Sequence, residues 1–139
     1  MENFEYYNPV KVVFGDGVLG QIGTYAARYG KKAMLVTYQE CTFFTKTIDQ
    51  IHKSLEEAGV SCIDYMGVTA NPKLSQARKG VALCREHGVD LLIALGGGSA
   101  IDCTKVIAAG VYYAHDMSQM LMLSHSDVNA IPPTRAMPY

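Results

Sequence analysis

Three consecutive glycines carry the strongest chemical signal in this chain of 139 residues. They stand in the segment Leu95-Gly-Gly-Gly-Ser99, between an apolar run and a sequence that favours a helix. Such a turn leaves backbone N–H groups unpaired at the positive end of a helix dipole, and glycine lets an anion approach them closely. The segment therefore predicts a phosphate-binding loop at the carboxyl end of a strand, where open α/β sheets bind ligands.

The same residues also fit a structural role. Ser99 followed by Asp102 resembles a capping box, which would use both side chains at the start of the helix. Three glycines in a row exceed what capping requires, so we prefer phosphate binding, with Ser99 capping the helix as well. For Lys105, one turn further along, a ligand contact and a solvated surface charge both remain open.

A second glycine pattern, Gly15-Asp-Gly-Val-Leu-Gly20, has the form of the dinucleotide fingerprint G-x-G-x-x-G. In that fingerprint an acidic residue at the end of the next strand binds the ribose hydroxyls. Here the next apolar run ends in Thr37-Tyr38-Gln39, and Asp16 inside the loop would repel a diphosphate. We interpret residues 15–20 as a turn, with nucleotide contact as the less favoured alternative.

Hydrophobic periodicity predicts the elements that position these loops. Three segments, starting at Leu19, Ile48 and Leu74, repeat apolar residues at i, i+3, i+7 and i+10, which is typical of helices packed by one face. Each segment is followed by a glycine suited to a left-handed C-terminal cap, namely Gly30, Gly59 and Gly88. A fourth helix is predicted from Ser99 towards Tyr113.

Short apolar runs at 33–36, 61–65 and 91–95 alternate with these helices, at the spacing of a βαβ unit. Runs that are apolar at nearly every position are typical of parallel strands covered on both faces. The chain is therefore predicted to be an α/β protein with one domain over residues 1–139, a Rossmann-like parallel sheet with flanking helices. Residues 11–14 are expected to add a strand that pairs at an edge.

Composition excludes several classes of function. With 12 Lys+Arg against 13 Asp+Glu, the chain lacks the basic surface of a nucleic-acid binder. No apolar run approaches the roughly 20 residues that span a membrane, and residues 1–8 do not read as a signal peptide, so a cytoplasmic location is expected. The four cysteines form no C-x-x-C pair and are expected to be buried thiols, not disulfides or zinc ligands.

The order of three motifs resembles the iron-containing (group III) alcohol dehydrogenases: Phe14-Gly-x-Gly17, Asn71-Pro72, and Gly96-Gly-Gly-Ser-x-x-Asp-x-x-Lys105. The run at 107–113 resembles the butanol dehydrogenase branch. This resemblance covers nearly the whole chain and implies a dehydroquinate synthase-like N-terminal domain that binds NAD(P)(H). Members of the family oxidise alcohols or reduce aldehydes with a nicotinamide cofactor and a divalent metal, iron or zinc.

Carried over by position, the resemblance places the diphosphate on Gly97, Gly98 and Ser99. Asp102 would lie near the nicotinamide, with Asn71 and Pro72 on the adenine side of the cleft. Position 38 helps to select the cofactor in this family, and the neutral Tyr38 does not exclude a 2′-phosphate, which favours NADP(H) slightly over NAD(H). The implied cofactor-binding residues are Thr37, Tyr38, Gln39, Asn71, Pro72, Gly96, Gly97, Gly98, Ser99 and Asp102.

The family's metal is held by one aspartate and three histidines of a C-terminal helical domain that lies beyond this chain. We therefore expect no catalytic residue and no metal ligand here. His52 and His87 are expected at the surface or its boundary, and His115-Asp116 and His125-x-Asp127 fit no familiar ligand spacing.

The isolated chain is expected to lack turnover, because a small alcohol or aldehyde would bind only if the helical domain is present. The alternative is a stand-alone, non-catalytic module that binds a nucleotide or forms oligomers. A homodimer is expected through the N-terminal segment, residues 4–14.

Overall fold

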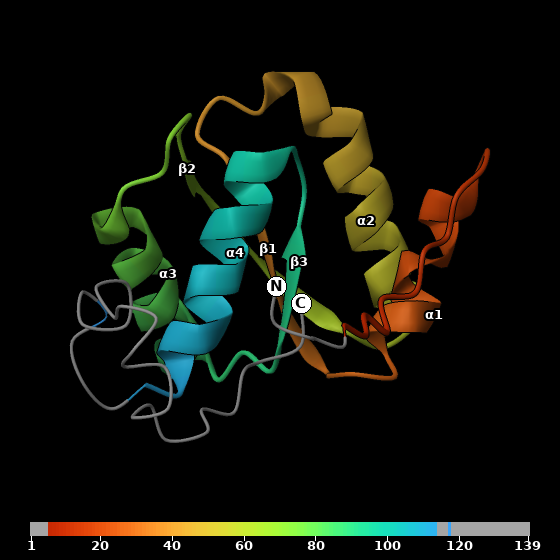
Figure 1. Cartoon of the computed structure of the whole chain (residues 1–139). Coiled ribbons are helices and arrows are strands. Elements are labelled where there is room, and N and C mark those ends of the chain that lie inside the picture. The colour runs from red at the N-terminus through yellow and green to blue at the C-terminus, as the bar shows by residue number, and fades with distance from the viewer. Residues whose placement is uncertain (1–5, 114–116, 118–139) are drawn as a thin grey trace.

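A parallel sheet between two layers of helices makes up the described part of the computed structural model, residues 6–113 and 117 (Figure 1). The strands are β1 (Lys32–Tyr38), β2 (Ser61–Val68) and β3 (Leu91–Ala94), in the order β2-β1-β3. The helices are α1 (Ile22–Ala26), α2 (Thr45–Glu57), α3 (Leu74–His87) and α4 (Gly98–Val111), with short 3-10 turns η1 (Val18–Gln21) and η2 (Thr42–Phe44). The predicted fold class is confirmed.

Strand β1 is the centre of the sheet and is buried on both faces. Met34 and Val36 belong to the core formed with α3 and α4, whereas Ala33 and Leu35 pack with α2 on the opposite face. This division follows from strand geometry, in which successive side chains point to opposite faces. It explains why the run at 33–36 is apolar at every position, as the sequence predicts for a strand covered on both sides.

The register of the sheet brings the carboxyl ends of the strands to one edge. Met34 lies opposite Ile63 of β2 and Leu92 of β3. The pairing of β1 with β2 shifts by one residue between Thr37 and Tyr38. Such a bulge bends the strand locally, and it lies where β1 reaches the glycine bend that follows β3.

Two of the three predicted glycine caps are confirmed. Gly59 and Gly88 have φ angles of 69° and 63°, in the left-handed region. Gly30 does not, and the prediction is wrong there. A Cβ on Gly30 would overlap the carboxylate of Asp90, which accepts the backbone N–H groups of the next two residues at 2.8–3.0 Å. This glycine is needed for close approach, not for a left-handed turn.

The segment before the first helix also differs from the prediction. Residues 11–14 form no strand, and the side chains of Val12 and Phe14 are 81% and 97% exposed. A strand is stable only when it is hydrogen-bonded to neighbouring strands. Residues 11–14 have no such neighbour among the described residues, so their apolar pattern does not make them a strand. The helix predicted from Leu19 is divided into η1 and α1.

Among the residues that the structure describes, no helix combines the length and the apolar character that crossing a bilayer requires.

The buried side chain of Ser54 joins α2 to the first helical segment. Its hydroxyl accepts the backbone N–H of Gly23 at 3.0 Å and donates to the carbonyl of Gly20 at 2.7 Å. Gly23 must be glycine, because a Cβ there would overlap the Ser54 carbonyl group. The contact between α1 and α2 therefore depends on one hydroxyl and one missing side chain.

We expect the substitution Ser54→Ala to lower the free energy of unfolding by about 1–3 kcal/mol, because two backbone groups then lose their partner. Denaturant unfolding measures this loss. The control is Ser75→Ala, at an exposed position of α3, which should leave the stability within experimental error. Equal effects of the two substitutions would contradict the role given to Ser54.

Candidate functional site

The glycine bend between β3 and α4 is held against the end of β1. Gly96 has a φ angle of 142°, and a Cβ on it would lie 2.5 Å from the ring of Tyr38. The conformation and the space both require glycine at this position. Gly97 is the N-cap of α4, and its backbone N–H donates to the Tyr38 hydroxyl at 3.2 Å.

The first two residues of α4 present free hydrogen-bond donors. The N–H groups of Ala100 and Ile101 donate to the carbonyl of Gly97 at 3.1 Å, whereas those of Gly98 and Ser99 have no partner among the described residues. A Cβ on Gly98 would meet no atom within 4 Å, so the space in front of these donors is open. Because α4 is 14 residues long, its dipole also favours an anion here. The bend therefore fits a phosphate or diphosphate group.

Ser99 does not cap the helix, and the predicted capping box with Asp102 is wrong. The helix begins at Gly98, its N-cap is Gly97, and no side chain makes the cap hydrogen bond. Ser99 therefore lies inside the first turn instead of at its boundary. Asp102 and Lys105 are exposed on the surface of α4. Since no cap uses the Ser99 hydroxyl, it remains available for a ligand at the start of the helix.

At the end of β1, Thr37 faces the interior, whereas the next three residues, Tyr38, Gln39 and Glu40, line a pocket. Thr37 is fully buried, and its hydroxyl donates to the carbonyl of Leu95 at 2.9 Å. This bond joins β1 to the start of the bend and uses the hydroxyl of a residue that the resemblance places at the cofactor. Tyr38 and Gln39 line a pocket of about 320 Å³ together with residues 68–70. The pocket adjoins the glycine bend through Tyr38.

A second pocket, of about 190 Å³, lies between the start of α3 and α4. Its lining includes Pro72 from the loop before α3 and Asp102 from α4. Asn71 is exposed and has a φ angle of 54°, a left-handed conformation that asparagine tolerates better than most residues. The structure thus brings Pro72 and Asp102 to one pocket, which is lined by other residues than the pocket beside Tyr38.

Two aromatic residues of this edge were missed by sequence reasoning. Phe44 stacks on Tyr38 with ring centroids 6.5 Å apart, and Phe43 meets Phe44 edge-on at 5.4 Å. The Phe43 side chain is 90% exposed. Two adjacent aromatic residues soon after the end of a strand, on a stretch with no other core pattern, are the signal that could have revealed them. They extend an apolar surface beside the pocket.

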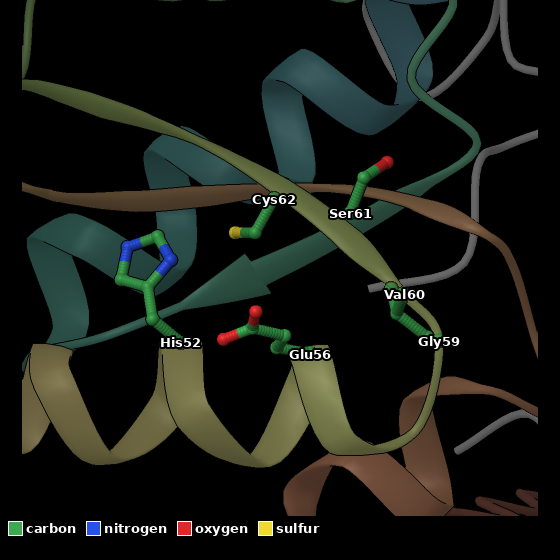
Figure 2. A pocket seen from close by; sticks show the side chains of 6 residues that line it. All are labelled: His52, Glu56, Gly59, Val60, Ser61 and Cys62. Atoms are coloured by element: carbon green, nitrogen blue, oxygen red, sulfur yellow. The ribbon is translucent and has the colours of Figure 1, made fainter.

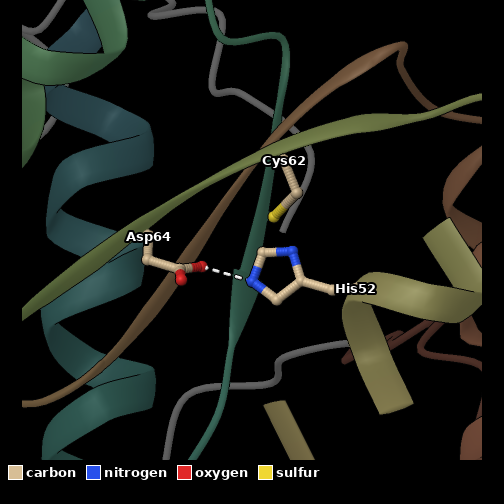
Figure 3. Close-up of side chains that lie close together, drawn as sticks. All are labelled: His52, Cys62 and Asp64. Atoms are coloured by element: carbon tan, nitrogen blue, oxygen red, sulfur yellow. Dashed lines mark hydrogen bonds and ion pairs between the residues drawn. The ribbon is translucent and has the colours of Figure 1, made fainter. Parts of the chain in front are cut away.

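A separate group of polar side chains lies between α2 and the first half of β2 (Figure 3). His52 Nε2 and Asp64 Oδ1 are 2.8 Å apart. His52, Cys62 and Asp64 each offer one atom that could bind a metal ion, and these three atoms lie within 4.8 Å of one another. Cys62 pairs with Ala33 and Asp64 with Leu35, so this group lies beside the first half of the strands, whereas the glycine bend lies at their carboxyl ends. It therefore does not fit a metal that would act on a substrate beside a cofactor at the bend.

The structure separates the four cysteines into two classes. All four are free thiols, with Cys84 and Cys103 buried as predicted. Cys41 and Cys62 are only half-buried, and here the prediction of buried thiols is wrong. Burial, and to a smaller extent the charge of Asp64, raises the pKa of Cys62 to about 11. Burial raises the pKa of Cys84 to about 12.

These pKa values predict how the thiols react. Because the thiolate is the nucleophile, alkylation of Cys62 should still rise about tenfold per pH unit between about pH 8 and pH 10, where an ordinary cysteine levels off. Iodoacetamide labelling followed by peptide mass spectrometry measures this rate. Cys84 serves as the internal control and should stay unmodified until the chain unfolds. A rate at Cys62 that reaches a plateau below about pH 9 would contradict the assignment.

Comparison with known proteins finds relatives along most of the chain. The chain is 44% identical over 132 residues to "Probable NADH-dependent butanol dehydrogenase 2" of Bacillus subtilis, covering 95% of this chain and 34% of that protein. It is 40% identical over 121 residues to "NADH-dependent butanol dehydrogenase A" of Clostridium acetobutylicum, covering 87% of this chain and 31% of that protein. The chain therefore spans about a third of the length of the curated relatives that it matches.

A solved structure confirms the fold. The crystal structure of NADH-dependent butanol dehydrogenase A from Thermotoga maritima matches with a TM-score of 0.76 and 33% identity, over 84% of this chain and 30% of that one. The sequence profile of the family described as "Iron-containing alcohol dehydrogenase" matches residues 9–138. The resemblance inferred from the motifs is thereby confirmed, and this chain belongs to the iron-containing alcohol dehydrogenase family.

Proposed function

We propose that this chain is the nicotinamide-dinucleotide-binding portion of a metal-dependent alcohol dehydrogenase or aldehyde reductase similar to the butanol dehydrogenases. One observation carries the proposal: the unpaired N–H groups of Gly98 and Ser99 lie at the exposed start of α4, at the carboxyl end of β3. Backbone donors, a helix dipole and open space together make a site for the diphosphate of a dinucleotide.

The two pockets, one lined by Tyr38 and the other by Asp102, supply the rest of the proposed site. Tyr38 and Gln39 would lie beside one end of the dinucleotide, and Gln39 is exposed and able to hydrogen-bond a ribose. Pro72 and Asp102 line the other pocket together. Asp102 would lie near the nicotinamide, and the place of Asn71 and Pro72 on the adenine side stays a prediction.

The cofactor, when bound, supplies or accepts a hydride at its nicotinamide ring. The residues of this chain bind the diphosphate, orient the two ends of the dinucleotide and hold the bend in place. The cluster around His52 lies beside the first half of the strands, so its residues would not reach a substrate beside a cofactor at the bend. Turnover of a small alcohol or aldehyde is proposed for the longer protein of this kind, and we expect none from residues 1–139 alone.

The choice between NAD(H) and NADP(H) has arguments on both sides. A neutral Tyr38 at the end of β1 does not repel a 2′-phosphate, which is the basis for the slight preference for NADP(H). The two bacterial relatives reported above carry NADH in their names, which favours NAD(H). We therefore propose either cofactor as a ligand, and titration with both decides between them.

The cytoplasmic location likewise stays a prediction.

The decisive comparison is between glycines of the two candidate loops. Neither Gly98 nor Gly20 has a positive φ angle, and a Cβ on either would meet no atom within 4 Å, so Gly98→Ala and Gly20→Ala should both preserve the fold. Only the methyl group at position 98 would fill the space in front of the free N–H donors. We expect Gly98→Ala to weaken NADH or NADPH binding at least about tenfold, a loss of about 1.4 kcal/mol, and Gly20→Ala to leave it unchanged.

Titration of each purified chain, followed by the fluorescence of the reduced cofactor, measures these affinities, and circular dichroism checks the fold. Equal weakening by both substitutions, or weakening by Gly20→Ala alone, would contradict the assignment. Failure of the unsubstituted chain to bind either cofactor would contradict the proposed function itself.

An oligomerising role is favoured by one feature of the structure. Five apolar or aromatic side chains before the first turn are more than half exposed: Tyr6, Tyr7, Val10, Val12 and Phe14. We expect this segment to mediate self-association, because exposed apolar surface is buried on pairing.

Light scattering of the chain tests this expectation. Val12→Ser/Phe14→Ser should shift the chain towards the monomer. An unsubstituted chain that remains a monomer at high concentration would contradict it.

A further inference from the structure

We propose that His52, Cys62 and Asp64 form a binding site for a zinc-like divalent cation, separate from the nucleotide site. The inference does not depend on the proposed function, because these residues lie on α2 and in the first half of β2, away from the glycine bend. The packing of α2 on β2 brings them together.

Two spacings bring the donors to one place. Cys62 and Asp64 are two residues apart on β2, so their side chains leave the strand on the same face. On α2, His52 is followed four residues later by Glu56, which places both on one face of the helix. His52, Glu56 and Cys62 line the same pocket, of about 390 Å³ (Figure 2). The helix and the strand therefore present potential ligands to a shared space.

The distances are close to those that an ion needs. Ligand atoms of a tetrahedral zinc ion lie about 3.4–3.7 Å from one another, given bond lengths of about 2.0–2.3 Å. The donor atoms of His52, Cys62 and Asp64 lie within 4.8 Å of one another, and rotation of the side chains shortens such distances. The hydrogen bond between His52 and Asp64, at 2.8 Å, would be replaced by two bonds to the ion.

The donor set selects the class of ion. Binding of the ion would displace the proton of the Cys62 thiol to solvent. The resulting thiolate, with an imidazole and a carboxylate, suits zinc and ions of similar softness, whereas calcium and magnesium prefer oxygen ligands alone. The side chains of His52 and Asp64 are 36% and 30% exposed, so an ion can enter from solvent. Glu56 lines the pocket with His52 and Cys62, so its carboxylate or water would supply a fourth ligand.

Cobalt(II) tests the proposal, because a thiolate bound to tetrahedral cobalt produces a charge-transfer band and intense visible bands. We expect the full chain of 139 residues to show these bands with one ion bound, and zinc to displace the cobalt. The substitution Cys62→Ser should abolish the charge-transfer band. Cys41→Ser is the matched control, since Cys41 is also half-buried but belongs to no such group, and it should retain the band.

Two further variants distinguish this site from others. His52→Gln and Asp64→Asn should each weaken cobalt binding by at least about tenfold, the size of loss that even the residues behind metal ligands produce. His115→Gln/His125→Gln should leave binding unchanged. Circular dichroism checks that each variant folds.

The proposal is overturned if the unsubstituted chain shows no thiolate band. It is also overturned if Cys41→Ser removes the band, or if the loss follows His115 and His125 instead of His52. After any of these results, the contact between His52 and Asp64 would be a surface hydrogen bond alone.

Discussion

The candidate site depends on how the last two residues of the central strand hold the glycine bend. Thr37 reaches from β1 to the carbonyl of Leu95, and the Tyr38 hydroxyl accepts the N–H of Gly97. Both hydrogen bonds hold the bend in a fixed position, because β1 is buried on both faces and cannot shift without disturbing two cores. With the bend fixed in this way, the start of α4 points its unpaired donors into open space. The function we propose follows from this arrangement more than from any single side chain.

Tyr38 illustrates how one residue combines support and recognition. Its ring covers Gly96, which explains the strict need for glycine there, and its hydroxyl satisfies a backbone donor that would otherwise be free. The same side chain lines the pocket beside the bend and stacks on Phe44. A dinucleotide bound at the bend would meet Tyr38 at the edge of its diphosphate, so the residue that supports the loop would also contact the ligand.

Much of the fold could be predicted from the sequence because local patterns and tertiary packing agree. The apolar run at 33–36 and the helical periodicity after Ile48 and Leu74 correspond to β1, α2 and α3. The bend itself was predicted because a triple glycine between a strand and a helix has few other uses. The family also followed from these motifs, and the profile match over residues 9–138 confirms it.

The errors arise where a residue's partner lies far away in the sequence. The cap prediction at Gly30 fails because the residue that requires a glycine there, Asp90, is sixty positions further along the chain. The bond of Thr37 to Leu95 could not be predicted either, because it depends on the pairing of β1 with β3. The group around Cys62 was missed for the same reason, since His52 approaches it only when α2 packs on β2. Spacing along the chain contains no signal for such contacts.

The central claim is that the backbone donors at the start of α4 bind a diphosphate, and amide NMR tests it most directly. Inorganic pyrophosphate or ADP would be added to the ¹⁵N-labelled chain while every backbone N–H signal is followed. The account predicts saturable shifts for Gly97, Gly98 and Ser99, with smaller shifts at Tyr38 and none at Gly15, Gly17 or Gly20. Shifts confined to the earlier glycine loop, or no saturable shift at the start of α4, would contradict it.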